Sequence, residues 1–337
     1  MRVCQILAGD EEGGLEKHTI ELSKALKNRG IDVTVIAHKK FKDDFGNIKF
    51  IEADLTKGRH NVFILWKLYT ILKQENFDII HTQANKATNM IITLKPFLKA
   101  KIVSTLHNYK KNLNSFVKAD AVITVSDRIG EKLSSNNKLT VYNGIQIEND
   151  HEIDLYKKFN IPKDKFIICS VGRLVEAKGF DLLIKSMQYM DKNIYLLLIG
   201  DGQDKDKLKN LSQKLNIKNR ITFVGNIENK LTKSIIKSSD LLVISSRREG
   251  FSYVFAESLL LDTPIVSTDV ADIKKFITNK YISAFDSKLF AEKVNDFKMN
   301  YNQNISEYQE IFNRAKNTFT LEKMTEQTIN IYKKVIN

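Results

Sequence analysis

The stretch SDLLVISSRREGFSYVFAESLLLD, residues 239–262, changes its hydrophobic pattern in the middle. Its first part is a short continuous apolar run, which predicts a buried strand ending near Ser245, and its last part has the apolar spacing of a helix. Glu249 is therefore expected in a loop, and Glu257 about one turn inside a helix. Strand, loop and helix in this order are the building unit of a parallel α/β sheet.

The backbone amides of Ser252, Tyr253 and Val254 lie between these two glutamates, at the start of the expected helix. The first N–H groups of a helix have no intrahelical acceptor and carry partial positive charge, so they suit a phosphate group. Glu249 and Glu257 tolerate such an anion only where they face its uncharged parts, and sugar hydroxyls are such parts. A nucleotide-sugar offers both, a diphosphate for the amides and hydroxyls for the glutamates.

The alternation of strand and helix patterns continues along almost the whole chain, in two series. The predicted strands are Val3–Leu7, Val33–Ala37, Ile48–Ile51, Asp78–His81, Ile102–Leu106, Ala121–Val125 and Leu139–Val141, then Phe166–Val171, Ile194–Ile199, Ile221–Val224, Leu241–Ile244 and Ile265–Ser267. The polar stretch at 149–165, with one of only three prolines, is the predicted linker. We expect two doubly wound domains, 1–150 and 151–319, with a helix at about 320–337 packing back on the first. Ligands bind outside the carboxyl ends of such strands, so two facing domains would enclose a central cleft.

The composition is that of an ordinary soluble protein, and 337 residues suffice for two domains with separate cores. The opening residues predict a short strand rather than a signal peptide, and no apolar stretch approaches the roughly 20 residues of a membrane span. Cys4 and Cys169 fall in predicted buried strands of different domains. This favours free thiols in a reducing compartment, and hence a cytoplasmic location.

The net charge is +13, and residues 79–119 hold seven lysines without one Asp or Glu. Such a segment is either a solvated surface or a docking site for anionic lipid, where each basic residue contributes roughly 1 kcal/mol. The apolar residues between Met90 and Leu98 fit an amphipathic helix, although burial in the core explains them equally. Nucleic acid is not expected as a partner, because the segment has no aromatic stacking pattern and no zinc or helix-turn-helix signature.

Other unusual residues also follow predicted strands. Gly13 and Gly14, after the opening strand, let the backbone approach a bulky ligand closely, although a glycine pair there is also typical of a tight turn. Arg173 and Lys178 lie five positions apart across a strand-to-helix turn, where both can converge on one anion. His107 follows a strand of the first half, and a lone histidine is more often a structural hydrogen-bonding residue than a catalyst.

The sequence contains, in order, the segments GGLEKH, DIIHTQ, TLHN, AVITVSDRI, VYNGI, SVGRLVEAKG, LLLIGDG, FVGNI and REGFSYVFAE. With these segments the chain resembles the family-4 glycosyltransferases, which have the GT-B architecture of two facing Rossmann-like domains. The most specific part is the E-x7-E element with R-x4-K upstream. The resemblance implies retaining glycosyl transfer from a nucleotide-sugar, without a metal ion or another cofactor.

The resemblance also implies roles for individual residues. Glu249 would contact the donor sugar near its 3-hydroxyl, Glu257 the ribose, and Arg173 and Lys178 the diphosphate, with His107 near the donor sugar. The other implied positions are Gly14, Gly172, Gly200, Asp201, Ile227, Phe251, Ser252, Tyr253 and Val254 on the donor side, and Gly13, Gly14, Glu16, His18 and His81 on the acceptor side.

The chemistry of the residues agrees with this assignment. A departing nucleoside diphosphate accumulates negative charge, which fixed cations and amides stabilise, so no metal ion is expected. A UDP-sugar is the favoured donor of a hexosyl or N-acetylhexosaminyl group. The expected acceptor is a lipopolysaccharide core or a lipid-linked glycan at the inner face of the cytoplasmic membrane. Front-face attack and double displacement both stay open, as do a sugar-nucleotide epimerase and an NAD-dependent oxidoreductase. The oxidoreductase lacks its G-x-G-x-x-G fingerprint and the acidic residue after its second strand.

Overall fold

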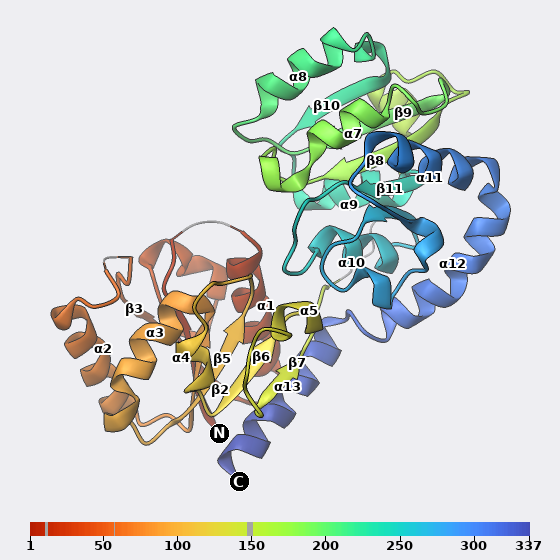
Figure 1. The fold of residues 1–337 in the computed structure, drawn as a ribbon. Coiled ribbons are helices and arrows are strands. Elements are labelled where there is room, and N and C mark those ends of the chain that lie inside the picture. The colour runs from red at the N-terminus through yellow and green to blue at the C-terminus, as the bar shows by residue number, and fades with distance from the viewer. Residues whose placement is uncertain (11–12, 57, 147–150) are drawn as a thin grey trace. The chain divides into compact units, whose positions relative to one another are not determined.

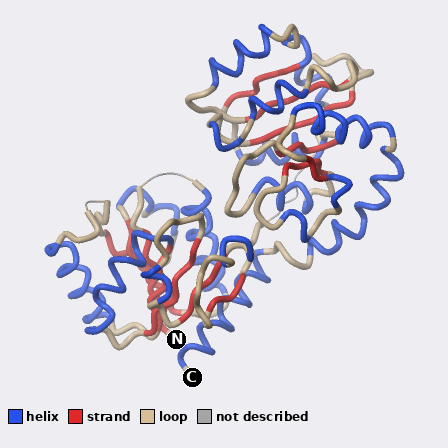
Figure 2. Tube along the Cα trace, viewed as in Figure 1, coloured by secondary structure: helices blue, strands red, loops and turns tan. Residues whose placement is uncertain are grey.

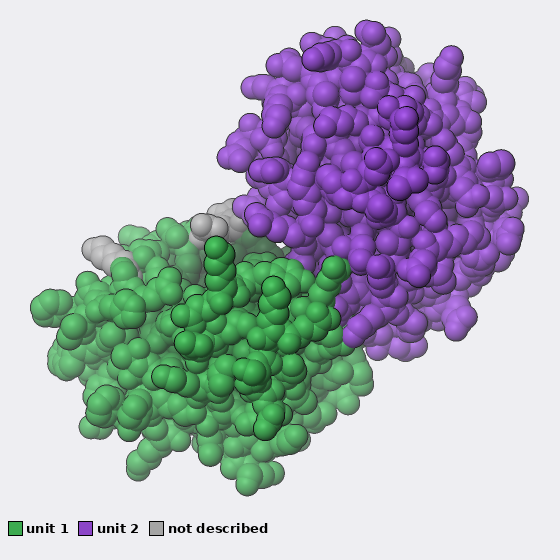
Figure 3. All heavy atoms as spheres, in the orientation of Figure 1, with its two compact units in different colours: residues 1–144, 319–337 green, residues 145–318 purple. Residues whose placement is uncertain are grey.

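The computed structural model describes residues 1–10, 13–56, 58–146 and 151–337. The chain forms two compact units, which Figure 3 shows in different colours. Unit 1 consists of Met1–Gly144 together with Phe319–Asn337, and unit 2 consists of Ile145–Thr318. The first boundary between the two units, after Gly144, therefore precedes the one expected at residue 150. Residues 147–150, and residues 11 and 12 of the glycine loop, lie outside the described residues.

Unit 1 is built on a parallel sheet in the order β3-β2-β1-β4-β5-β6-β7, with helices on its faces (Figures 1 and 2). Its strands are β1 (Arg2–Leu7), β2 (Asp32–Ala37), β3 (Lys49–Glu52), β4 (Ile79–Gln83), β5 (Lys101–Leu106), β6 (Ala121–Thr124) and β7 (Lys138–Thr140). Its helices are α1 (Gly14–Asn28), α2 (Val62–Glu75), α3 (Ala84–Leu94), α4 (Asn114–Val117), α5 (Asp127–Gly130) and α13 (Leu321–Ile336). The central strands β1, β4 and β5 are buried along almost their whole length because helices cover both of their faces, and their polar side chains, such as Gln5, His81 and Ser104, are buried too.

Unit 2 repeats this plan with the parallel order β10-β9-β8-β11-β12-β13. Its strands are β8 (Phe166–Val171), β9 (Ile194–Ile199), β10 (Ile221–Gly225), β11 (Leu241–Ile244), β12 (Ile265–Thr268) and β13 (Ile282–Ser283). Its helices are α6 (Leu155–Phe159), α7 (Phe180–Ser186), α8 (Lys205–Lys214), α9 (Asn229–Ser238), α10 (Tyr253–Leu260), α11 (Ser287–Met299) and α12 (Tyr301–Lys316). The predicted fold class, two Rossmann-like doubly wound sheets, is confirmed. Each predicted strand is present within two residues of its bounds, and β13, too short for a sequence signal, was not predicted.

The predicted linker is wrong for the part that the structure describes. Residues 151–165 belong to unit 2 and include α6. Leu155 and Ile161 are buried, and the amide of Ile153 donates a hydrogen bond to Oγ of Ser238 over 2.8 Å. The polar composition that suggested a linker belongs to the solvent-facing side of a short helix, while its apolar residues pack into the core.

The chain ends with α13, which packs against α1 in unit 1 (Figure 1). Its Tyr332 is fully buried, and the Tyr332 hydroxyl lies 2.6 Å from Nδ1 of His81 and accepts a hydrogen bond from Nε2 of Gln5 over 3.0 Å. The last helix therefore supplies part of the core beneath the central strands of the first sheet.

The amphipathic helix expected near Met90 is α3, and its apolar face is not available to a membrane. Met90, Ile91 and Leu94 are buried, and α3 packs against β4 and β5. Cys4 and Cys169 are buried free thiols, as expected, and burial raises the pKa of Cys169 to about 12. No helix among the described residues has the length and apolar character needed to cross a membrane.

Candidate functional site

The strand order of unit 2 reverses between β8 and β11. The chain leaves β8 toward β9 on one side and continues from β11 toward β12 on the other. The loops that follow these two strands therefore diverge, and ligands of open α/β sheets bind in the resulting crevice at the carboxyl ends. Residues 172–179 and 245–252 form the two loops. They contain the predicted residues Gly172, Arg173, Lys178, Glu249, Phe251 and Ser252.

Lys178 and Glu249 come together at this point. Nζ of Lys178 lies 2.6 Å from Oε1 of Glu249, and Oγ of Ser246 donates to the same oxygen over 2.8 Å. The Glu249 side chain is only 9% exposed. Both residues line one small pocket with Ser246, Ser252 and Val254. In the described part of the chain no group donates to Oε2 of Glu249, which leaves this oxygen for a donor on a ligand.

The loop after β8 crosses the loop after β11 at Gly179, which has a left-handed backbone with φ of 65°. A Cβ atom there would lie 1.9 Å from the carbonyl oxygen of Ser245. Only glycine allows this approach, since any side chain would force the loops apart. The crossing holds Lys178 over the end of β11, and its side chain passes beside Gly172, whose Cβ position would lie 3.4 Å from Cε of Lys178.

The N-terminus of α10 forms one wall of the same pocket. Ser252 is its N-cap, with Oγ accepting from the amide of Phe255, and Tyr253 and Val254 begin the helix. Phe251 and Tyr253 stack edge to face, with ring centroids 5.4 Å apart. Glu257 lies in the second turn and is buried, but it does not line the pocket around Lys178. Glu249 and the start of α10 thus line the same pocket, whereas Glu257 lies one turn further along the helix.

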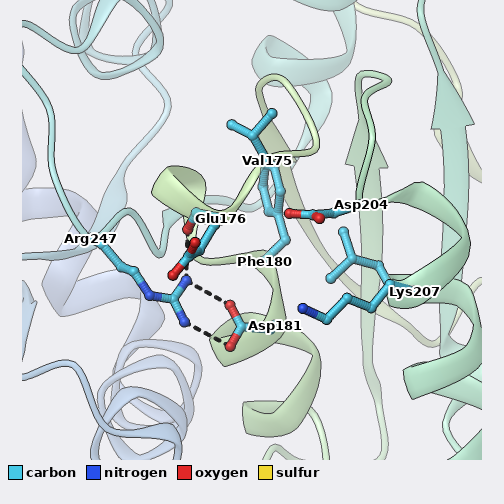
Figure 4. Close-up of a pocket in the computed structure, with 8 residues that line it drawn as sticks. Val175, Glu176, Phe180, Asp181, Asp204, Lys207 and Arg247 are labelled. Atoms are coloured by element: carbon cyan, nitrogen blue, oxygen red, sulfur yellow. Dashed lines mark hydrogen bonds and ion pairs between the residues drawn. The ribbon is translucent and has the colours of Figure 1, made fainter.

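Arg173 and Arg247 differ in what they can offer an anion. Among the described residues the exposed guanidinium of Arg173 has no hydrogen-bond or ion-pair partner. Arg247 instead pairs with both carboxylate oxygens of Asp181, over 2.7 and 2.8 Å, and donates to the carbonyl oxygen of Glu176 (Figure 4). Hydrogen bonding to Asp181 raises the pKa of Arg247 further. Arg247 therefore stabilises the loop, while Arg173 stays available to a ligand.

Among the other predicted donor-side residues, Gly200 and Asp201 occupy positions that the fold itself explains, whereas Ile227 does not. A Cβ on Gly200 would lie 2.0 Å from the carbonyl oxygen of Gly172, so glycine is required there by the neighbouring loop. Asp201 accepts from the amide of Gly202 over 2.7 Å and pairs with Lys205 over 2.6 Å, and the hydrogen bond from Lys205 lowers the pKa of Asp201. Ile227 is half-buried in the loop between β10 and α9, and no contact joins it to the Lys178 pocket.

The predicted acceptor-side residues gather where β1 leads into α1. Gly13 precedes α1 and Gly14 is its first residue. Glu16 is buried, and a Cβ on Gly13 would lie 3.5 Å from its Oε2, so the glycine loop and this carboxylate share one small volume. His18 is also buried, with its ring centroid 4.8 Å from that of His107 in an edge-to-face arrangement.

His107 ends a hydrogen-bonded chain that begins at the C-terminal helix. Nε2 of His107 lies 2.9 Å from Oε1 of Gln83, and Nε2 of Gln83 donates to Oε1 of Gln5 over 2.9 Å. Gln5 in turn donates to the Tyr332 hydroxyl. Burial holds the pKa of His107 well below its usual value. His107 is thus a neutral, oriented imidazole rather than a cation near neutral pH.

His81 does not occupy the acceptor-facing position that was expected. It is fully buried in β4, between the Tyr332 hydroxyl and Oγ1 of Thr105, which lies 2.6 Å from its Nε2. Burial lowers the pKa of His81 to about 3. The strand-end position of His81 resembled that of His107, but β4 continues for two residues beyond it, to Gln83. The sequence pattern did not single out Ser246, Gln83 or Tyr332 as site residues. Ser246 follows β11, Gln83 ends β4, and Tyr332 lies on the buried face of α13.

The described residues include no cluster of three or more His, Cys, Asp and Glu side chains that could hold a metal ion. Lys178 and the start of α10 line the pocket, and Arg173 lies in the same loop as Lys178. The arrangement is therefore suited to binding an anion through fixed cations and amides.

Comparison with known proteins identifies the chain. The family model described as "Glycosyl transferases group 1" matches residues 152–318, and the one described as "Glycosyltransferase Family 4" matches residues 12–149. The chain belongs to these glycosyltransferases. One relative is similar over most of its length. LpsE of Rhizobium meliloti strain 1021, a lipopolysaccharide core biosynthesis glycosyltransferase, is 27% identical over 265 residues, which cover 77% of this chain and 76% of LpsE.

Two solved glycosyltransferase structures share its fold. A glycosyltransferase from Rickettsia africae ESF-5 has a TM-score of 0.86 at 18% identity, with 100% of this chain and 98% of that chain covered. Anabaena Alr3699/HepE, in complex with UDP and glucose, has a TM-score of 0.83 at 17% identity, covering 99% and 100%. The fold of this glycosyltransferase is accordingly GT-B.

Proposed function

We propose that this glycosyltransferase moves a hexosyl or N-acetylhexosaminyl group from a UDP-sugar to a glycan acceptor, with retention of configuration and without a metal ion. The observation that carries the proposal is the Lys178–Glu249 pair, only 2.6 Å apart beside the start of α10. It combines a cation for a diphosphate with a carboxylate for sugar hydroxyls at one switch point. The structure of Anabaena Alr3699/HepE with UDP and glucose supports a donor of this class.

The proposed chemistry needs positive charge where the diphosphate leaves. Lys178 supplies a point charge, Arg173 a guanidinium that is not held by a carboxylate, and Ser252 to Val254 their helix-start amides. Such preorganised groups stabilise the charge that develops on the leaving group. Oε2 of Glu249 accepts from a hydroxyl of the donor sugar. The acceptor hydroxyl attacks on the face that the diphosphate leaves, and a diphosphate oxygen takes its proton.

The proposed acceptor is a lipopolysaccharide core or a lipid-linked glycan. The name of LpsE, a lipopolysaccharide core biosynthesis glycosyltransferase, supports this class. The glycine loop at Gly13 and the buried Glu16 and His18 lie at the carboxyl edge of the first sheet, where an acceptor would bind. We place the enzyme on the inner face of the cytoplasmic membrane, where such acceptors are presented.

Replacing Glu249 and replacing Glu257 are expected to have different effects on UDP affinity and on turnover. Because we assign Glu257 to the ribose, Glu257→Ala should weaken UDP binding by about tenfold or more, the scale of a lost hydrogen bond to a charged group. Glu249→Ala should leave the affinity for free UDP within about threefold and lower kcat, because it contacts the sugar. Isothermal titration with UDP and steady-state kinetics measure both effects. An equal loss of UDP affinity in the two variants would refute the division of roles.

A further inference from the structure

An unusual group of large apolar side chains is exposed on unit 1. Val62, Phe63 and Trp66 on α2 are 73%, 84% and 68% exposed, and Phe97 after α3 is 69% exposed. We call these four residues the α2 patch. The helix is firmly started at this point, because Oδ1 of Asn61 accepts from the amides of Phe63 and Ile64. The exposure is therefore a property of a formed helix, whose other face buries Leu68 and Leu72.

The α2 patch continues along the helix toward Phe97. The ring of Tyr69, one turn beyond Trp66, meets the ring of Phe97 edge to face, with centroids 6.2 Å apart. Nζ of Lys73 lies 5.6 Å from the centroid of the Tyr69 ring. Next to Phe97 is a pocket of about 240 Å³, whose lining includes Leu72, Lys73, Phe77, Phe97, Leu98 and Lys99. Apolar contact area and positive charge thus alternate along one strip.

The one acidic residue of α2, Glu75 at its C-terminal end, is already paired with Arg2 over 3.2 Å and with Lys49 over 2.6 Å, so the remaining charges of the helix are basic. From Gly58 to Gln74 the chain carries Arg59, Lys67 and Lys73 and no acidic residue, and Lys99 belongs to the acid-free segment 79–119. Lys95 does not contribute, because it is paired with Asp120 over 2.8 Å and donates to the carbonyl oxygen of Lys118. The basic residues at the strip are thus those of α2 and Lys99, rather than the whole lysine-rich segment.

We propose that the α2 patch inserts into the interface of an anionic membrane. Aromatic rings and a tryptophan on an exposed helix face, with lysines beside them and no carboxylate between, match the composition of interfacial anchors. A protein partner would favour a patch with mixed charges at its rim, whereas the charged residues of 58–74 are all basic and Glu75 is neutralised by its ion pairs. The lysines attract the lipid phosphates, and Val62, Phe63, Trp66 and Phe97 enter the boundary of the acyl region.

The α2 patch also has a definite position relative to the first sheet. Because α2 follows the parallel strand β3, its N-terminal end, with Val62 and Phe63, is at the carboxyl edge of the sheet, the edge where the glycine loop lies. Insertion there would bring the acceptor side of unit 1 to the lipid surface. This last point rests on the proposed function, whereas membrane docking itself does not.

The experiment uses the fact that Trp66 is the only tryptophan of the chain. The full-length protein is titrated with vesicles of phosphatidylglycerol and phosphatidylethanolamine, and with vesicles of phosphatidylcholine alone. We expect the emission of Trp66 to shift to shorter wavelength and to become protected from iodide with the anionic vesicles at low salt. The shift should diminish as salt screens the lysines. An emission unchanged by anionic vesicles at low salt would overturn the proposal.

Co-sedimentation of variants with the same vesicles tests whether the α2 patch and its lysines are responsible for binding. Phe63→Ser with Trp66→Ser should weaken partitioning about 100-fold, or tenfold for each ring that no longer leaves water. Met299→Ser, which changes an equally exposed side chain of unit 2, is the matched control and should have no effect. Lys67→Glu with Lys73→Glu should abolish the preference for anionic lipid, and Lys163→Glu with Lys218→Glu should not.

Binding of UDP verifies that each variant is folded and separates this proposal from the previous one. If the unmodified protein binds vesicles but not UDP, the proposed function is contradicted and membrane docking is not. If it binds UDP but not vesicles, membrane docking is contradicted and the proposed function is not. A third outcome is that the protein does not bind vesicles but dimerises as its concentration rises, and that the Phe63 and Trp66 double variant does not dimerise. This result would assign the α2 patch to a second copy of the chain and overturn the proposal.

Discussion

Replacing Lys178 with Ala is expected to lower the rate of glycosyl transfer by about 10²-fold or more, the scale of a lost oxyanion donor. Lys178 is the only cation within 4 Å of the Glu249 carboxylate in the described part of the chain, and it lines the pocket at the start of α10. Removing it would leave both a departing diphosphate and the nearly buried Glu249 carboxylate without their positive charge. The effect should appear in kcat, because the leaving-group charge is largest in the transition state.

Arg173→Ala provides a second test of the same charge without disturbing Glu249, and we expect a loss of similar size. Lys185→Ala is the matched control, since Lys185 is half-exposed on α7 and lies 3.7 Å from Asp181. It should keep the rate of the unmodified enzyme. The rate should also survive EDTA, because these cations replace a metal in the proposal. Abolition of activity by EDTA, with recovery on adding Mg²⁺, would contradict the metal-free mechanism.

Acidification is expected to destabilise unit 1 far more than unit 2. Three buried histidines of unit 1 carry lowered pKa values because burial disfavours their charged forms: His18 at about 4, His81 at about 3, and His107 well below its ordinary value. His18 and His107 are in ring contact, so each proton also opposes the next. These imidazoles therefore stay neutral in the folded protein near neutral pH.

The direction of the effect follows from proton binding. Below pH 6.5 the unfolded chain takes up protons on these histidines, while the folded protein does not until the pH reaches about 4 for His18 and about 3 for His81. The stability that comes from keeping these histidines neutral is therefore fully retained above pH 6.5. It is lost as the pH falls from 6.5 toward the pKa values of the folded protein. Each histidine lowers the free energy of unfolding by about 1.4 kcal/mol for each pH unit in this window. The three together therefore lower it by about 4 kcal/mol between pH 6 and pH 5.

Hydrogen exchange between pH 7 and pH 5, corrected for the intrinsic exchange rate, measures this loss in each unit. Amides of β1, β4 and β5 should lose protection, and those of β8 and β11 should keep it. His81→Gln should reduce the pH dependence by about one third, whatever it does to the stability at pH 7. His60→Gln, at an exposed position, should leave it unchanged. Equal loss of protection in both units would show that the histidines are not responsible.

The fold was predictable because many of its strands are short apolar runs between helical patterns, as in residues 194–199. Parallel strands buried on both faces give this signal, whereas β13, with two residues, is too short to give it. The linker was mistaken because α6 is short and mostly polar on its outer side. Sequence spacing identifies which residues are amphipathic, but not which partner covers their apolar side. For this reason α3 was considered for the membrane, and α2, with its exposed Phe63 and Trp66, was not.

The donor-side predictions rest on topology, whereas the acceptor-side predictions depend on long-range packing. Arg173, Lys178 and Glu249 follow directly after the two strands of one switch point, and topology alone brings such loops together. His81 looked like His107 in the sequence because both end an apolar run. Their difference depends on two further residues of β4 and on Tyr332, which arrives from the distant C-terminal helix. Long-range packing of this kind leaves no local sequence signal.

The most direct test of the account is a thermal-shift titration of the unmodified protein with UDP, UMP, GDP, ADP and NAD. We expect UDP to raise Tm, with UMP much less effective because it lacks the second phosphate that Lys178 and Arg173 are proposed to bind. The UDP effect should be lost in the variant with both Lys178→Ala and Arg173→Ala. Stabilisation by NAD but not by UDP, or an equal response to UDP and UMP, would contradict the assignment of a nucleotide-sugar diphosphate to this site.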